Sequence, residues 1–194
     1  MPENKIFYGL SMVHIAPIID MQNGEPTYGT PFHFPGAVSW GEAPEGENNP
    51  FRADNSDYYI SAGNDGYTGD LEVARVIDEF NKKIYGMQDG TNGELIEIVQ
   101  GEAVPFGMVL QIEGDKSATR YCYPYCTAER ASADHSTTEE GAIEPGTETI
   151  PISCKPLEVN NVTIAKWRIP KDSPKYTSIL ETFELPEIES EISA

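Results

Sequence analysis

Short apolar or alternating segments, separated by Gly, Pro and Asn, run along most of this chain. They predict short strands joined by turns, because successive side chains of a strand point to opposite faces. Asn23-Gly24 between apolar flanks predicts a hairpin turn, and 114–116 predicts a second turn. The segments expected to be extended are 5–16, ending at Pro17, and 18–34, 67–73, 94–99, 106–113, 118–129, 147–155 and 159–169.

The segment 77–85 is the one convincing helix in the pattern. Its apolar residues fall on one face, which should pack on a sheet: Ile77, Phe80 and Ile84. Acidic residues precede basic ones by four positions, which favours two ion pairs: Asp78–Lys82 and Glu79–Lys83. Gly86 should end this helix. The segment 176–183 is a short helix or a strand, and the pattern leaves both open.

The segment 41–66 combines acidic, Gly, Pro and Asn residues with aromatic ones. A loop exposed only to water rarely contains several aromatic side chains, since burying them is favourable. Two interpretations stay open: a long contact loop that binds another molecule, or a loop folded onto its own core. Under the first interpretation, the candidate assembly residues are Trp40, Phe51, Tyr58 and Tyr59.

Composition narrows the class of protein. The 194 residues suit one domain, and the 17 Gly and 15 Pro are scattered, which favours many strands and turns. The formal net charge of −19 repels phosphate backbones, and the sparse basic segment 166–175 is no basic stripe. The N-terminus lacks a signal peptide pattern and no apolar run approaches the ~18 residues of a membrane span. We therefore expect synthesis in a cytoplasm and reduced thiols.

Motifs of catalysis and cofactor binding are missing from the sequence. It contains no Gly-x-Ser-x-Gly elbow, no phosphate loop and no dinucleotide fingerprint. A calcium loop centred on Gly66 would place Ser61 and Gly63 where carboxylates are needed. We therefore expect no enzyme activity, no catalytic residue, no cofactor and no metal site.

The three cysteines do not predict a metal site either. Cys122 and Cys126 lie on one predicted strand, and simple alternation would place both on one face. Zinc prefers four ligands, and only Cys154 and His135 remain to complete a set. Buried structural cysteines are the favoured interpretation, because a free cysteine packs as a small apolar residue.

Several segments, in order, resemble the major tail proteins of long-tailed, non-contractile phages. The resemblance spans about 4–183 and rests on the order and spacing of four segments. These are Pro44-Glu45-Gly46 through Pro50–Asn55 to Tyr58-Tyr59; Asn64–Glu72 with Asp78-Glu79-Phe80 and Gly86; Asp89–Glu97; and Arg120–Cys126 with Glu144-Pro145 and Thr147-Glu148-Thr149.

The resemblance implies a single domain, 1–194, that is mainly β: a two-sheet β-sandwich or small barrel flanked by one helix, with a long extended loop (41–66) and terminal arms. It implies hexameric rings stacked into a tail tube, the conduit for genome delivery, with the loop and termini contacting neighbouring copies. Implied partners are the chain itself and tape-measure, tail-terminator and tail-initiator proteins, while DNA passes without specific binding. The protein would be made in the host cytoplasm and end in the virion. The acidic segment 185–194 matches least and should be frayed.

Other classes of function are compatible with the same pattern. A β-sandwich binding module could stack sugars on Trp40, Tyr58 and Tyr59. A baseplate or tail-terminator protein of the same fold would form one ring and no tube. A hydrolase without a familiar motif is a third class. The acidic composition and the missing chemistry favour the tail tube.

Overall fold

The computed structural model describes residues 9–46, 48–53, 56–62, 64–112, 118–133 and 146–187. Within them, ten strands form one antiparallel sheet with the main order β2-β1-β10-β11-β13-β7-β4. The main strands are β1 (Leu10–Gln22), β2 (Glu25–Tyr28), β4 (Ala37–Glu45), β7 (Gly66–Val73), β10 (Phe106–Ile112), β11 (Arg120–Ala128) and β13 (Glu148–Lys155). Three short strands join its sides: β3 (Phe32–His33), β12 (Ser132–Ala133) and β16 (Trp167–Ile169).

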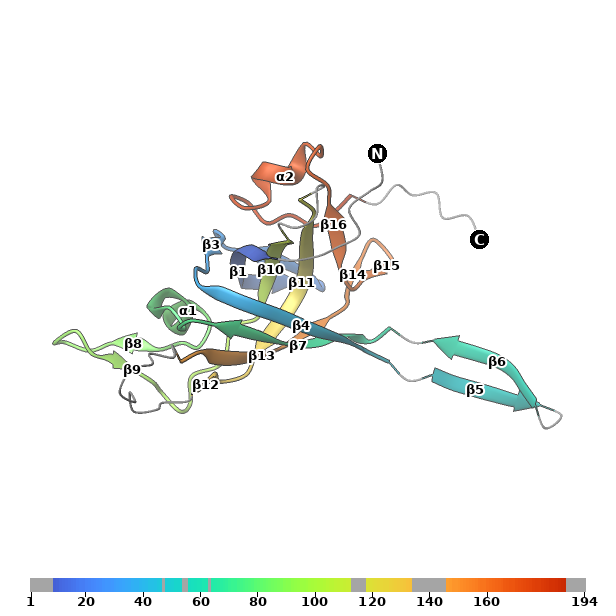
Figure 1. Cartoon of the computed structure of the whole chain (residues 1–194), viewed down its shortest axis with the longest axis horizontal. Helices are drawn as coiled ribbons and strands as arrows, with labels where there is room; N and C mark the ends of the chain where they lie inside the picture. The colour runs from blue at the N-terminus through green and yellow to red at the C-terminus, as the bar shows by residue number, and fades with distance from the viewer. Residues whose placement is uncertain are drawn as a thin grey trace, which may run out of the picture.

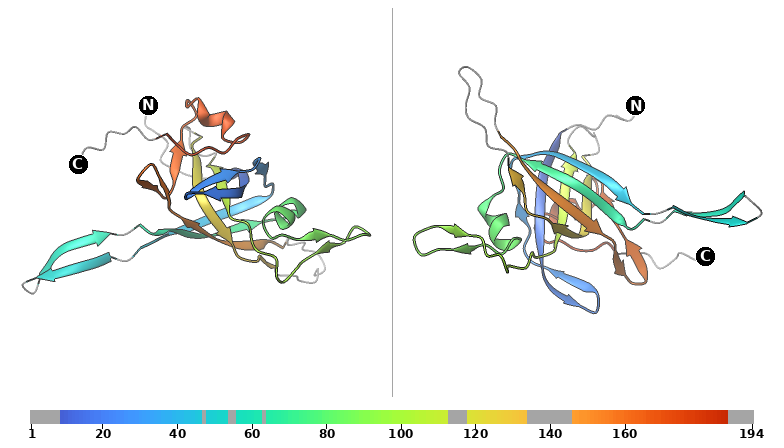
Figure 2. Two further views of the ribbon diagram at one scale, coloured as in Figure 1. Left: turned by 180° about the vertical axis from the view of Figure 1, so that it is seen from behind. Right: turned by 90° about the horizontal axis from the view of Figure 1, so that it is seen from below.

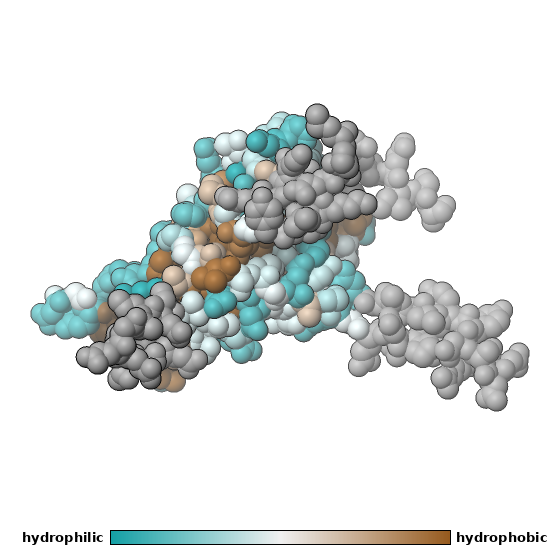
Figure 3. Space-filling view, viewed as in Figure 1, coloured by the Kyte–Doolittle hydropathy of each residue, from teal (hydrophilic) through white to brown (hydrophobic). Residues whose placement is uncertain are grey.

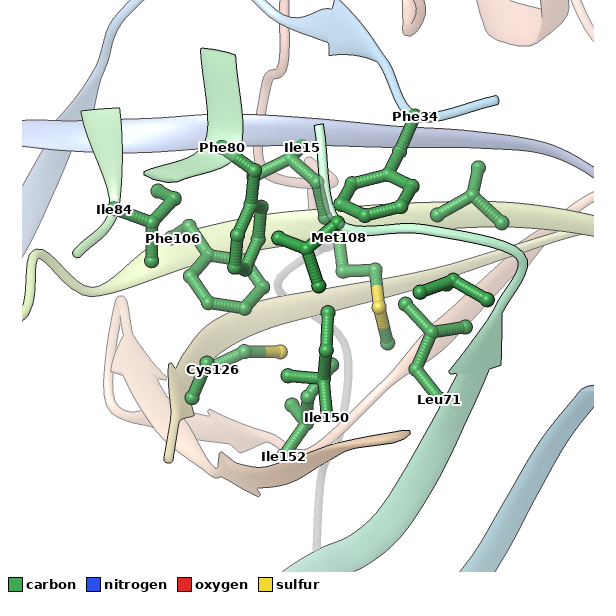
Figure 4. Close-up of a cluster of buried hydrophobic side chains, with 14 of the residues drawn as sticks. Ile15, Phe34, Leu71, Phe80, Ile84, Phe106, Met108, Cys126, Ile150 and Ile152 are labelled. Carbon is green, nitrogen blue, oxygen red and sulfur yellow. The ribbon is translucent and has the colours of Figure 1, made fainter. Parts of the chain in front are cut away.

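The sheet folds over on itself into two layers, one made of β1, β10 and β11 and the other of β13, β7 and β4 (Figure 1). Figure 2 shows the strands of the two layers crossing. Apolar side chains from both layers fill the space between them, as Figure 4 shows for Ile15, Met108, Leu71, Ile150 and Ile152. The described chain is therefore a mainly β sandwich, as predicted.

Helix α1 (Asp78–Lys83) covers one end of this core. Phe80 is fully buried, and the helix is followed by Gly86 at φ +69°. The predicted pair Glu79–Lys83 forms at 2.7 Å. The predicted pair with Asp78 is wrong: Lys82 instead binds Asp89 of β8 (Gln88–Asp89) at 2.6 Å, since a loop folding back offers a nearer carboxylate.

The first strand does not end at Pro17. β1 pairs with β10 as far as Pro17↔Phe106, then continues to Gln22 and pairs with β2. A proline lacks an N–H donor, but its carbonyl can still bond, and the Pro17 carbonyl accepts from the Gly29 N–H at 2.7 Å. β1 therefore changes its pairing partner from β10 to β2 at Pro17, the residue that lacks an N–H donor. The predicted turn at Asn23-Gly24 is confirmed, with both residues at positive φ.

Two other predicted strands are shorter or divided. The segment 94–99 contains only β9 (Leu95–Ile96), which pairs with β8. The segment 159–169 is divided, because Asn160 and Asn161 adopt positive φ and make a turn. That turn joins β14 (Leu157–Val159) to β15 (Val162–Ile164), and β16 follows.

The ambiguous segment 176–183 begins inside a short helix, α2 (Lys175–Ser178), and its residues Ile179 and Phe183 are buried. They pack with Ala16, Val109 and Cys122 in a second apolar cluster on the outer side of the β1–β10–β11 layer. The predicted turn at 114–116, residues 5–8 and the end of the tail, 188–194, lie outside the described residues.

A β-bulge in β11 overturns the prediction that Cys122 and Cys126 share a face. Phe106 and Met108 of β10 pair with Cys126 and Tyr123, so three steps on β11 oppose two on β10. One extra residue reverses the alternation beyond it. Cys126 therefore packs in the core between the layers, and Cys122 in the outer cluster. Both are buried, as predicted.

Candidate assembly surfaces

The segment expected as a long loop is for the most part a two-stranded ribbon. β4 and β7 pair as far as Glu45↔Gly66, and the Asp65 N–H donates to the Glu45 carbonyl at 2.8 Å. β5 (Asn48–Ala53) and β6 (Ser56–Ala62) then pair with each other. We call residues 45–65 the arm. Figures 1 and 2 show β5 and β6 reaching away from the body of the molecule.

The arm is acidic and its two strands pair only with each other among the described residues. It contains five acidic residues and one basic residue: Glu45, Glu47, Asp54, Asp57 and Asp65 against Arg52. A two-stranded hairpin without further packing is at best marginally stable in water. The arm therefore has the properties of a segment that gains stability from a partner surface.

A polar cluster fixes the root of the arm to the body. The Tyr123 hydroxyl donates to the Glu42 carboxylate at 2.6 Å, and the Trp40 indole N–H donates to the Tyr123 oxygen at 3.3 Å. Lys166 binds Glu42 at 2.7 Å and lies 3.9 Å from the centre of the Tyr67 ring. Burial raises the pKa of Tyr123, so its hydroxyl stays a donor. These contacts set the direction in which β4 and β7 leave the body.

Gly69 is required where the Trp40 ring crosses β7. A Cβ there would lie 2.5 Å from the Gly41 carbonyl and 2.7 Å from the Trp40 ring. We expect Gly69→Ala to lower the free energy of unfolding by about 1–3 kcal/mol, because the backbone and ring must shift. Gly41→Ala is the matched control, since nothing lies within 4 Å of its Cβ position. Urea denaturation of both variants tests this, and equal effects would contradict it.

The outer face of the β4–β7–β13 layer carries mostly small side chains and two carboxylates. The rows of this face across the three strands are Ser39–Glu72–Thr149, Gly41–Asp70–Pro151 and Ala43–Thr68–Ser153, and their members are exposed or half-buried. A shallow hollow of about 510 Å³ lies over the last two rows. Asp70 and Glu72 are the charged members of these rows, and Glu72 accepts from Ser39 at 3.0 Å. We call this surface the acidic face.

The two outer faces of the sandwich differ. The β1–β10–β11 layer is covered by the C-terminal segment through Ile169, Ile179 and Phe183. Among the described residues, no comparable apolar cluster covers the acidic face. Figure 3 shows mostly hydrophilic residues around the body, with apolar ones gathered in its middle. In the described part of the chain, the acidic face is therefore the outer face that no other element covers.

The ends of the sheet present unpaired strand edges. β4 pairs only with β7 among the described strands, and β2 only with β1. Exposed apolar side chains lie near both ends: Val38 on β4 is 51% exposed, and Ile19 on β1 is 68% exposed. An open edge offers rows of free donors and acceptors to another chain. Both edges are thus candidate contacts between copies.

The four predicted assembly residues fall in two places. Trp40 lies at the arm root, half-buried against Tyr123 of its own core. Phe51, Tyr58 and Tyr59 belong to β5 and β6, and their side chains lie outside the described part of the structure. Sequence reasoning missed Glu42, Tyr123 and Lys166. No local pattern joins Glu42 to Lys166, which is 124 positions away.

His14 of β1 makes the stability of the folded chain depend on pH. It faces His33 of β3, with ring centres 5.1 Å apart, and burial lowers its pKa below the usual 6.5. Below pH 6.5 the unfolded chain gains a proton that the folded chain resists, so stability falls as pH decreases, by at most about 1.4 kcal/mol per pH unit.

The expected result is a lower free energy of unfolding at pH 5.5 than at pH 7.5, measured in urea, with the drop reduced in His14→Gln. His33→Gln is the matched control, because His33 is exposed, and it should keep most of the drop. The interpretation fails when His14→Gln retains the full drop.

No protein-family model matches this chain, and no curated protein matches it. The solved structures similar to it include two with the following similarities. One is a chain of the cryo-EM structure of the anti-feeding prophage (AFP) baseplate, with a TM-score of 0.45, 8% identity, and coverage of 87% of this chain and 97% of that one. The other is the crystal structure of Hcp1 from Salmonella typhimurium, with a TM-score of 0.32, 13% identity, and coverage of 82% and 95%. Both TM-scores are too low to assign this chain a family or a function.

The described residues hold neither a cluster of metal ligands nor a membrane-spanning helix. Within the described ranges, no group of three or more His, Cys, Asp or Glu side chains gathers where an ion could be held. In the same residues, no helix has the length and apolar character to cross a membrane.

Proposed function

We propose that this chain is a structural virion protein, without enzyme activity, that polymerises into rings stacked as the tail tube of a long-tailed, non-contractile phage. Hexameric rings are the form that the sequence resemblance implies. The resemblance spans most of the chain, and the mainly β sandwich with its projecting arm agrees with it.

The arm is the observation that carries this proposal. Its root is held by Trp40, Glu42 and Lys166, so it projects in a defined direction, and its strands lack a described partner. A surface that binds a different surface of the next copy gives a ring when the rotation closes. The arm meets a neighbouring copy in this way, within a ring or between stacked rings.

The open edges and the acidic face suit the rest of the assembly. Joining β4 of one copy to the β2 end of the next would satisfy the free edge groups. The acidic face would then line the channel, with Asp70 and Glu72 toward the lumen. Duplex DNA would pass without binding, since like charges repel within ~8 Å of the wall at physiological salt.

Electron microscopy of the concentrated protein tests the proposal. Rings or tubes are the expected result, and a map of the tube should show the β4–β7–β13 layer toward the channel. A tail-initiator protein should promote assembly, and tape-measure and tail-terminator proteins are further expected partners. Strict monomers under all conditions, including with an initiator protein, would contradict the proposal. Single rings that never stack would instead indicate a baseplate or terminator role.

A further inference from the structure

Two buried thiols face each other in the core. Cys126 of β11 and Cys154 of β13 are directly paired in the ladder between these strands, and their sulfur atoms are 2.9 Å apart. Their exposed fractions are 0% and 1%. A covalent S–S bond measures about 2.05 Å, so the sulfur atoms need to close by only about 0.9 Å.

We propose that Cys126 and Cys154 form a dithiol site that a small two-electron oxidant, such as hydrogen peroxide, converts into a disulfide. One sulfur attacks the peroxide, releasing water and becoming a sulfenic acid. The second sulfur attacks the first, the S–S bond forms, and a second water leaves. In total, two thiols and one peroxide give one disulfide and two waters. The site requires no metal and no other cofactor.

The third cysteine is excluded from this chemistry by the β11 bulge. Cys122 lies on the other side of the layer, packed with Val109, Ile179 and Phe183. It is fully buried like Cys126, but its neighbours in that cluster are apolar and include no second thiol. The chain therefore contains its own matched control for a buried thiol without a partner.

Burial sets the expected rate and the class of oxidant. Desolvation raises the pKa of the Cys126 thiol, so little reactive thiolate is present at neutral pH. A bulky disulfide reagent cannot reach a pair with almost no exposed surface, whereas peroxide can enter during local opening. The reaction should thus be slow, and low urea concentrations should accelerate it.

The bond would join the two layers of the sandwich at the ladder between β11 and β13, which connects them. β11 and β13 pair at four positions, Tyr125–Ala128 with Ile152–Lys155, whereas β13 and β7 pair at seven. The disulfide would close a loop between residues 28 positions apart and tie the arm-bearing layer to the other layer. The thiol chemistry does not depend on the proposed function. In a virion outside its host, the oxidant would act after assembly.

Oxidation of the folded full-length chain by peroxide tests this site. The mass should fall by about 2 Da, and thiols counted after denaturation should fall from three to one. A peptide map without reductant should join the Cys126 and Cys154 peptides. The melting temperature should rise by about 10 °C and return with dithiothreitol.

Matched variants separate the pair from general oxidation. Cys122→Ser should still lose two thiols, whereas Cys126→Ser should form no bond within the chain. If a variant does not fold, the peptide map of the wild-type chain is sufficient to show whether Cys126 and Cys154 are joined. A bond that includes Cys122, or addition of oxygen to the cysteines without a 126–154 bond, would overturn the proposal. The experiment does not involve assembly, so its outcome is separate from that of the tube.

Discussion

Replacing residues 46–64 with a short Gly-Ser turn is expected to give a folded monomer that forms no tubes. The arm extends past the last β4–β7 pair, and β5 and β6 pair only with each other among the described residues. Its removal leaves the described members of the buried clusters in place, because all of these lie outside 46–64. Negative-stain microscopy and sedimentation would measure assembly, and a thermal melt would measure folding.

Val99→Ser is the matched control for the arm replacement. Val99 is 95% exposed and follows β9 in the sequence, and β9 lies at the end of the molecule opposite the arm (Figure 1). This variant should assemble like the parent. An arm-less chain that unfolds would show that the arm belongs to the core, and an arm-less chain that forms tubes would exclude its role in assembly.

Phe80→Ala is expected to lower the free energy of unfolding by about 3–5 kcal/mol, a larger loss than that expected for Gly69→Ala. The Phe80 ring is fully buried and packs edge-on against Phe34, Tyr85 and Phe106, at centre distances of 5.2, 5.1 and 5.9 Å. Alanine would remove these contacts and leave a cavity beneath α1, which the surrounding side chains fill only in part.

Lys82→Ala on the same helix is the control for Phe80→Ala. Its ion pair with Asp89 is exposed, so the substitution should change stability by about 0.5 kcal/mol or less. Equilibrium unfolding in urea would measure both variants. A cost below about 1 kcal/mol for Phe80→Ala would contradict the packing described for the core.

Local patterns were sufficient for much of the fold. Alternation located β7 and β13, whose inward side chains are the more buried ones, and apolar segments located β10 and β11, which are buried on both faces. The spacing of Phe80 and Ile84 located α1, and Asn23-Gly24 located a hairpin. These signals are local: a residue's neighbours within a few positions decide them.

The candidate site was predictable only in part. The aromatic residues among acidic ones indicated a possible contact segment at 41–66, and Trp40 lies at the root of the arm. The ribbon itself was missed, because its Gly, Pro and Asp residues favour loops when each is considered alone. Pairing between β5 and β6 decides their conformation, and pairing depends on both strands together.

By itself, the sequence determined a mainly β chain with an amphipathic helix within 77–85, observed at Asp78–Lys83, a strongly acidic charge and buried cysteines. The tertiary structure decided which sheet faces remain uncovered and which distant side chains come into contact. It placed Lys166 on Glu42, and through one extra residue in β11 it brought Cys126 to Cys154 and turned Cys122 away. The physical reason is that strand register and layer packing join residues far apart in the chain, and no local pattern records those contacts.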